Sequence, residues 1–90
     1  MEIVWAANAW DDYLHWQKEN PDLAEKINEL IKDIRRTPFT GLGKPEPLRG
    51  KLAGWWSRRI NSEHRFVYKV EGKRGQGQKL CIAGCRYHYE

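Results

Sequence analysis

A single carboxylate in a basic, proline-rich segment is the first feature of this sequence that suggests chemistry. Glu46 lies in Lys44-Pro45-Glu46-Pro47, and Arg49 and Lys51 follow shortly after it. The flanking prolines restrict the backbone, so the carboxylate is held rigidly. Such a carboxylate can serve as a general base that removes a proton from a hydroxyl group. It can also simply neutralise the nearby positive charge, and the residues alone leave both interpretations open.

Two further side chains, Arg65 and His88, complete a set that is suited to cleaving RNA without a metal ion. In that reaction a base removes the proton of the 2′-hydroxyl, and the 2′-oxygen attacks the adjacent phosphorus. A guanidinium stabilises the added negative charge, and an imidazole can protonate the leaving 5′-oxygen. DNA lacks the 2′-hydroxyl, so this chemistry selects RNA. Glu46, Arg65 and His88 are the predicted base, anion clamp and acid.

The other histidines and the two cysteines are predicted to have structural roles. His15 lies in an expected helix and His64 in a turn, where packing and a hydrogen bond are the simplest roles. His88 lies in a C-terminal segment with two tyrosines, for which binding is at least as reasonable as a frayed end. Cys81 and Cys85 would lie about 13 Å apart on one strand, beyond disulfide reach, so we expect buried thiols. No zinc signature or nucleotide-binding glycine loop is present, so no metal and no cofactor are predicted.

Charge is distributed unevenly along the chain. Residues 1–34 carry eight acidic and three basic side chains, whereas residues 35–90 carry thirteen basic and four acidic ones. A basic half is typical of proteins that bind polyanions, although basic residues can also merely solvate strand surfaces. No apolar run approaches the ~20 residues that cross a bilayer, and the N-terminus has an acid where a secretory signal is basic. We therefore expect a cytoplasmic protein without membrane contact.

The first half of the sequence predicts a strand and two helices. Ninety residues with eleven aromatic side chains suit one compact domain, which is expected to span residues 1–90. A short buried strand is predicted over residues 3–6, and a helix runs from an Asn8 cap to about residue 19. A second helix begins after Asn20-Pro21 and ends at Thr37-Pro38. Its apolar side chains recur with helical spacing on one face.

The second half predicts a loop and then a small sheet. Residues 37–54 contain three prolines and four glycines, which is typical of a long functional loop. Strands are expected over residues 55–61, 65–70 and 79–87, with a turn-rich link at 71–78. The predicted fold is α+β: a strand, two helices and three hairpin-linked strands, with both helices packed on one face of a small antiparallel sheet.

The other face of that sheet is expected to be open and basic. Alternation along the strands directs Arg65 and Lys69 away from the core and places Arg58 and Arg59 on opposite sides. Provided that no bulge shifts the register, parity places four residues of the last strand on one face. These residues are Ile82, Gly84, Arg86 and His88.

Several long segments match one known family in order. They are Trp10–Tyr13, Lys26–Asp33, Arg35–Phe39, Gly41–Leu48, Trp56–Ile60, Glu63–Arg65 with Val67-Tyr68, and Ala83–Tyr89. Together they closely resemble the Txe/YoeB toxins of the RelE superfamily, over nearly the whole chain. The resemblance implies an RNase-like α+β fold, frequently dimeric in this branch. It also implies a ribosome-dependent endonuclease that cleaves mRNA in the decoding site and is held inactive by a YefM-type antitoxin.

The resemblance also assigns roles by position. Glu46 corresponds to the general base, Arg65 to the transition-state stabiliser and His88 to the general acid. Tyr89 corresponds to a C-terminal aromatic residue that shapes the site or stacks on a base. Contacts to mRNA or ribosomal RNA are expected from Lys44, Arg49, Lys51, Arg58 and Arg59. The long link at 71–78 and the additional Glu90 depart from the family pattern, and deletion of Glu90 is predicted to change the strength of activity.

Two other functions fit the same charge pattern. One is a non-catalytic RNA- or ribosome-binding module that blocks translation by occupancy, since phosphate contacts dominate affinity whether or not a bond is cut. The other is a β-sheet DNA-binding repressor. The family resemblance implies that operator DNA is bound mainly through the antitoxin complex, so the repressor is the weaker alternative.

Overall fold

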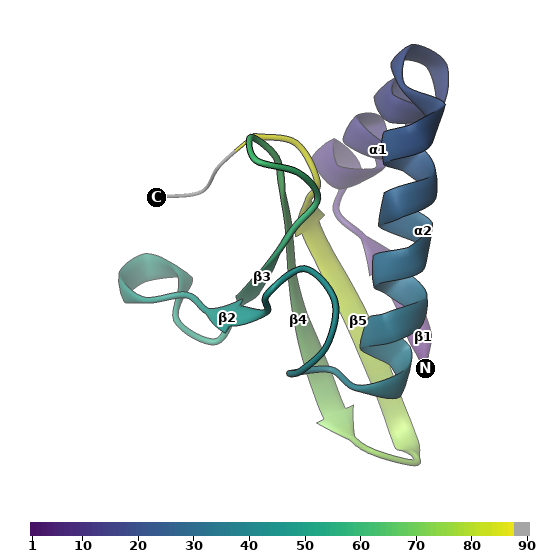
Figure 1. Cartoon of the computed structure of the whole chain (residues 1–90). Helices are drawn as coiled ribbons and strands as arrows, with labels where there is room; N and C mark the ends of the chain where they lie inside the picture. Colours follow the sequence, from purple (N-terminus) through teal and green to yellow (C-terminus); the bar gives the residue numbers. More distant parts are fainter. Residues whose placement is uncertain (88–90) are drawn as a thin grey trace.

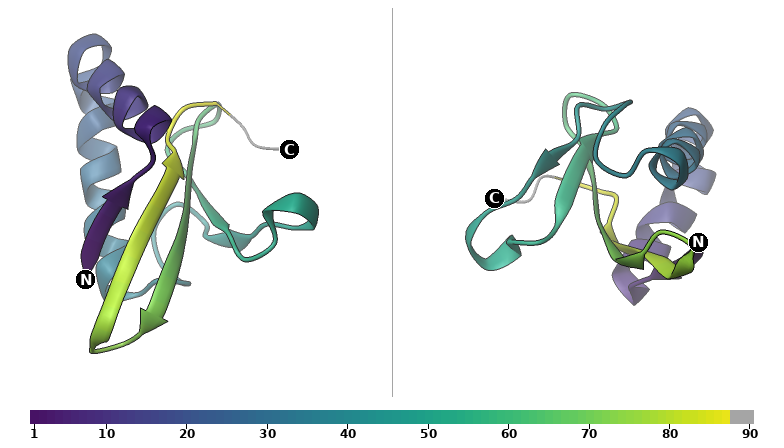
Figure 2. Two further views of the ribbon diagram at one scale, coloured as in Figure 1. Left: turned by 180° about the vertical axis from the view of Figure 1, so that it is seen from behind. Right: turned by 90° about the horizontal axis from the view of Figure 1, so that it is seen from below.

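Two helices lie against one face of a five-stranded sheet (Figures 1 and 2). The structure is a computed structural model of the whole chain, and it describes residues 1–87. Its elements are β1 (Glu2–Trp5), α1 (Ala7–Glu19), α2 (Pro21–Arg36), β2 (Glu46–Pro47), the 3₁₀ helix η1 (Gly50–Leu52), β3 (Trp56–Arg59), β4 (Arg65–Lys73) and β5 (Gln76–Gly84). The predicted α+β class, with both helices on one face, is confirmed.

The strands follow the order β1-β5-β4-β3-β2 across the sheet. Neighbouring strands run antiparallel except β1, which pairs in parallel with β5. The sheet is therefore mixed, and the prediction of an antiparallel sheet is wrong for this pair. A parallel partner far along the chain leaves no local signal, because turn residues mark only antiparallel neighbours.

β1 also differs from its prediction in burial. Ile3 is 36% and Val4 39% exposed, whereas the sequence predicts a buried strand. β1 is an edge strand with β5 as its sheet neighbour, so its apolar side chains are covered on fewer sides. Trp5 is better covered, because its ring centroid lies 5.5 Å from that of Trp10 and 4.8 Å from that of Tyr13.

The two helices differ in how well the sequence marks their starts. α2 begins as predicted, with Pro21 as its first residue and the Asn20 side chain accepting a hydrogen bond from a first-turn amide. α1 begins at Ala7, so Asn8 is not its cap. Asn8 Nδ2 instead donates to the carbonyl of Ala83 at 2.8 Å, which ties α1 to β5.

The core lies between the helices and the sheet. It contains the apolar face of α2 together with residues of α1, β4 and β5, and Ile27, Leu30 and Phe66 are fully buried in it. Cys85 belongs to this core as predicted, whereas Cys81 is only half-buried. Burial, and to a lesser degree the carboxylate of Asp12, raises the pKa of the Cys85 thiol to about 12.

The link predicted at 71–78 is a tight hairpin. β4 continues to Lys73 and β5 starts at Gln76, so only Arg74-Gly75 forms the turn. The glycines of this stretch have positive φ angles, which suit the turn and the register shift between Glu71 and Lys73. The number of glycines predicts an irregular link. In the structure these glycines instead lie in a hairpin whose exposed end is formed by β4 and β5.

β5 ends three residues earlier than predicted, at Gly84. Tyr87 has a φ of 67°, so strand parity does not continue to this residue. Ile82 is 1% exposed in the core, which contradicts its predicted place on the open face with Arg86. The fourth member of that predicted set, His88, lies outside the described residues.

The proline- and glycine-rich segment 37–54 contains two short elements that the sequence did not predict. β2 adds an edge to the sheet, and η1 projects from it on the side away from the helices (Figures 1 and 2). Among residues 1–87, neither helix is apolar and long enough to traverse a bilayer.

Candidate active site

The open face of the sheet carries a small pocket where β2, β3 and β4 lie side by side. Its volume is about 130 Å³. It is lined by Lys44, Glu46, Leu48, Ser57, Arg59, Arg65 and Val67. The structure thus brings together the predicted base, the predicted anion clamp and two of the predicted RNA-binding residues.

The register of the strands explains this grouping. Glu46 pairs with Ser57, and Ser57 pairs with Val67 on the other side. Two positions farther along β3, Arg59 pairs with Arg65. Residues two positions apart on a strand project to the same face. The carboxylate of Glu46 therefore shares a face with both guanidinium groups.

Arg59 and Arg65 form a like-charged pair across two strands. Such a pair directly opposite in a sheet is destabilising, so it is unfavourable for folding alone. Arg65 Nη1 donates to the carbonyls of Asn61 at 2.8 Å and His64 at 3.1 Å, which restrains its guanidinium. Arg59 is exposed, and its side chain has no hydrogen bond or ion pair to residues 1–87. The arrangement is suited to binding an anion between the two arginines.

Two backbone hydrogen bonds hold the segment that carries Glu46 against β3. The amide of Leu48 donates to the carbonyl of Trp55 at 2.8 Å, and the amide of Arg59 donates to the carbonyl of Gly43 at 2.7 Å. Glu46 itself is exposed, so its carboxylate is accessible to a ligand. These hydrogen bonds lie just before and just after the short strand β2. They restrain its backbone, as the flanking prolines predict.

His64 has the structural role that its position in a turn predicts. It is 6% exposed, and its Nδ1 accepts a hydrogen bond from the amide of Tyr87 at 2.8 Å. The carbonyl of Tyr87 in turn accepts from the amide of Arg65 at 3.1 Å. The backbone of residue 87 is therefore fixed beside the pocket. The predicted acid His88 and the predicted aromatic residue Tyr89 lie outside the described residues.

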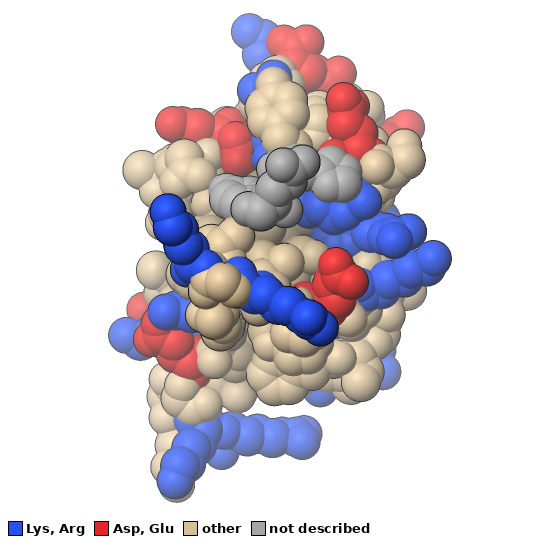
Figure 3. All heavy atoms as spheres, turned by 90° about the vertical axis from the view of Figure 1, so that its left-hand side faces the viewer, with Lys and Arg blue, Asp and Glu red and all other residues tan. Residues whose placement is uncertain are grey.

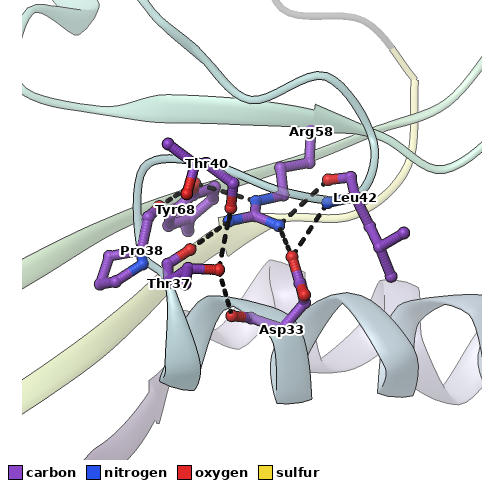
Figure 4. A network of polar contacts seen from close by, with 7 residues as sticks. All are labelled: Asp33, Thr37, Pro38, Thr40, Leu42, Arg58 and Tyr68. Carbon is purple, nitrogen blue, oxygen red and sulfur yellow. Dashed lines mark hydrogen bonds and ion pairs between the residues drawn. The ribbon is translucent and has the colours of Figure 1, made fainter.

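Arg58 does not have the place that was predicted for it. Its side chain is fully buried on the helix-covered face of β3, where it forms an ion pair with Asp33 (Figure 4). A buried guanidinium cannot contact RNA without breaking that ion pair. The prediction of an RNA contact is therefore wrong for Arg58, although the prediction that Arg58 and Arg59 lie on opposite sides is confirmed.

The two remaining predicted RNA-binding residues lie near the pocket but do not line it. Arg49 immediately precedes η1 and Lys51 lies within it, and both are exposed. Figure 3 views the molecule from the side of β2 and η1 and shows Lys and Arg side chains spread across that face. Basic residues thus extend beyond the pocket to η1 and the residue before it.

Sequence reasoning missed Ser57, which lines the pocket between Glu46 and Val67 and is 7% exposed. The available signal was the two-residue spacing of Ser57 and Arg59, which places both on one face of a strand. Within residues 1–87, no group of three or more His, Cys, Asp or Glu side chains is arranged to hold a metal ion.

Comparison with known proteins assigns the chain to a family. A family model of YoeB-like toxins of bacterial type II toxin–antitoxin systems matches residues 5–89. The chain belongs to this family. The resemblance found in the sequence is therefore confirmed: the chain is a member of the YoeB-like toxins of type II toxin–antitoxin systems.

The relatives cover the chain almost completely. Toxin YoeB of Escherichia coli K12 is 56% identical over 99% of this chain and 100% of its own length. A YoeB/ParE toxin from Agrobacterium tumefaciens has a structure that is 56% identical, with a TM-score of 0.93, over 99% of this chain and 100% of that one. Two Staphylococcus aureus structures cover 99% of this chain and 98% of theirs. One is a YoeB dimer, 42% identical with a TM-score of 0.88, and the other is a YoeB–YefM complex, 43% identical with a TM-score of 0.87.

Proposed function

We propose that this toxin is a ribosome-dependent, metal-independent endoribonuclease that cleaves mRNA and thereby inhibits translation. The single observation that carries this proposal is the pocket on the open sheet face, in which Glu46 lies beside Arg59 and Arg65. A carboxylate and two guanidinium groups on one accessible surface are the groups needed to activate a 2′-hydroxyl and to bind the phosphate next to it.

In the proposed reaction Glu46 accepts the 2′-hydroxyl proton, and the 2′-oxygen attacks the adjacent phosphorus. Negative charge develops on the phosphoryl oxygens, where the restrained guanidinium of Arg65 can donate hydrogen bonds. Arg59 and Lys44 supply further positive charge at the same pocket. The 5′-oxygen of the downstream fragment leaves and takes up a proton. The upstream fragment then ends in a 2′,3′-cyclic phosphate.

The proposed acid is His88, and Tyr89 would stack on a base. The described chain ends at Tyr87, whose carbonyl accepts a hydrogen bond from the Arg65 amide. The backbone of Tyr87 thus lies next to the residue that would bind the phosphate. Arg49 and Lys51 would contact RNA farther along the strand, where exposed basic residues bind phosphates with little regard to sequence.

The proposed partners follow from charge and from the relatives. Related structures show a YoeB–YefM complex and a YoeB dimer from Staphylococcus aureus. We propose that a YefM-type antitoxin binds this chain through an acidic segment that folds on the basic pocket. It would cover Arg65 and His88 or displace the C-terminal residues. We further propose that a homodimer forms and that operator DNA is bound only through the antitoxin complex.

The test is to map the 5′ ends of mRNA on purified ribosomes exposed to the toxin. We expect new ends with the parent chain, and upstream products that carry the 2′,3′-cyclic phosphate left by attack of the 2′-hydroxyl. Glu46→Gln, Arg65→Met and His88→Ala should each reduce cleavage by about 100-fold or more. Glu29→Gln, on the exposed face of α2, is the matched control and should cleave like the parent.

The same experiment separates cleavage from simple occupancy of the ribosome. Stalled translation without new 5′ ends would favour the non-catalytic binding module. Parent-like cleavage by all three variants at equal concentration would show that the residue assignment is wrong.

A further inference from the structure

The guanidinium of Arg58 uses every hydrogen-bond donor that it has. An arginine side chain has five N–H groups in a planar fork. Nε donates to the hydroxyl of Tyr68, Nη1 to Asp33 Oδ2 and the carbonyl of Leu42, and Nη2 to the carbonyls of Thr37 and Thr40 (Figure 4). A fully satisfied buried cation of this kind rigidifies whatever provides its acceptors.

Its acceptors lie mainly in one irregular segment, residues 37–43, which joins α2 to the strand carrying Glu46. Two partners of Arg58 also bind this segment themselves. Asp33 Oδ2 accepts a hydrogen bond from the amide of Leu42 at 2.9 Å, and the Tyr68 hydroxyl donates to the carbonyl of Pro38 at 2.6 Å. Burial raises the pKa of Tyr68, so its hydroxyl keeps the proton that it donates. The segment is thus wrapped around one guanidinium.

Two glycines show how closely the segment is packed there. A Cβ at Gly41 would clash with Asp33 Oδ2, and a Cβ at Gly43 would lie 2.9 Å from the carbonyl oxygen of Arg59. Both residues also have positive φ angles. The path of the chain at these positions therefore requires glycine and permits little displacement.

The end of this segment leads directly into the pocket. The carbonyl of Gly43 accepts from the amide of Arg59 at 2.7 Å, Lys44 follows as a pocket residue, and Glu46 comes two residues later. Arg58 and Arg59 are neighbours in β3. The side chain of Arg58 therefore binds the middle of segment 37–43, and the amide of Arg59 binds its last residue. A shift of the segment would move the backbone of Glu46 relative to Arg59.

We propose that Arg58 is a positioning residue, which sets the distance and angle between the carboxylate of Glu46 and the phosphate bound at Arg59 and Arg65. The proposal rests on the proposed function of Glu46. Arg58 touches no RNA, so its replacement should slow the chemical step and leave binding unchanged. Misplacing a catalytic group by about 1 Å can cost about 100-fold in rate.

The critical variant is Arg58→Lys, which keeps the charge but has three donors and no planar fork. We measure kcat and KM for cleavage of mRNA on ribosomes, at a temperature where circular dichroism shows each variant folded. We expect kcat to fall by about 100-fold with KM unchanged within about 2-fold. Leu80→Ala, which removes buried atoms from β5 outside this network, is the control for lost stability and should keep the parent kcat.

A double-mutant cycle with Glu46→Gln tests the route of the effect. If Arg58 acts through Glu46, then Arg58→Lys causes no further loss in the Glu46→Gln background. A parent-like kcat for Arg58→Lys, an equal loss in the Leu80→Ala control, or an undiminished loss in the Glu46→Gln background would each overturn the proposal. Full activity of Glu46→Gln alone would instead overturn the proposed function.

A milder variant keeps the proposal testable if Arg58→Lys does not fold. Tyr68→Phe retains the guanidinium and removes the hydroxyl that joins Arg58 Nε to the carbonyl of Pro38. We expect a severalfold lower kcat with an unchanged KM. In the Glu46→Gln background, Tyr68→Phe should cause no further loss of kcat. An unchanged kcat for this variant would overturn the proposal.

Discussion

Arg58 and Arg59 are adjacent in β3, yet they belong to two different environments. Arg58 faces the helices, is fully buried and has all five N–H donors bonded within the chain. Arg59 faces outward, is exposed and lies opposite another arginine in the pocket. An arginine thus stabilises the fold on one face of the strand, and another arginine is available for a ligand on the other face.

The difference shows what decides the role of a charged residue in a sheet. Strand parity selects the face, and the surroundings on that face then supply either acceptors or solvent. On the helix-covered face, carbonyl groups of an irregular segment and the carboxylate of Asp33 replace water around the guanidinium. On the open face, the guanidinium of Arg59 remains exposed to solvent, where an anion can bind it.

The largest expected effect is the difference in unfolding free energy between variants of Arg58 and of Arg59. Arg58→Met should lower the free energy of unfolding by about 3–5 kcal/mol, because it leaves Asp33 and several carbonyls without their donor. Arg59→Met should change it by no more than about 0.5 kcal/mol. Urea unfolding followed by tryptophan fluorescence measures both. Equal losses for the two variants would abolish the distinction between the faces.

A second, smaller effect is the pH dependence of the stability that Asp33 contributes on the buried face. The hydrogen bond from the Leu42 amide, and then that from Arg58, lower the pKa of Asp33. A carboxylate with a lowered folded pKa contributes its full stability above its unfolded pKa, about 3.9, and loses it as the pH falls from there through the folded pKa.

The measurement is the difference in unfolding free energy between the parent and Asp33→Asn, followed across pH. The advantage of the parent should be constant above about pH 5 and should shrink below about pH 4. An advantage that stays constant or grows on acidification would show that the ionised carboxylate of Asp33 does not stabilise the fold.

The smallest expected effect concerns the open face and appears only with a ligand. Arg59→Ala should reduce the slope of log K against log salt for RNA binding by about 0.7, the value for one phosphate contact on a single strand. Lys32→Ala, exposed on α2, is the control and should leave the slope unchanged. Identical slopes for parent and Arg59→Ala would remove Arg59 from the binding surface.

The parts of the fold that follow from the sequence are those with local causes. The start of α2 follows from Asn20-Pro21, and the grouping of Glu46 with Arg65 was first suggested by residue chemistry and then by the family resemblance. The parallel pairing of β1 with β5 depends on contacts between the two ends of the chain, which no short segment encodes. β5 ends at Gly84, whereas the sequence prediction extended strand parity as far as His88.

Arg58 shows most clearly where sequence reasoning stops. Charged side chains are rarely buried, so an arginine in a basic chain is first taken as a surface residue. Its burial depends on acceptors from residues 33 to 42, none of which is adjacent to it in the sequence. A spacing rule could place Arg58 on the covered face, but only the path of that segment shows what meets it there.

The facing arginines of β3 and β4 also bear on how the chain behaves without a partner. A polyanion that binds between them more tightly than it binds the unfolded chain stabilises the fold, so thermal resistance rises with its concentration. Antitoxin and transcript would then compete for the same source of stabilisation. If the proposed antitoxin and RNA both bind at this pocket, the uncomplexed chain is the least stable of the three forms.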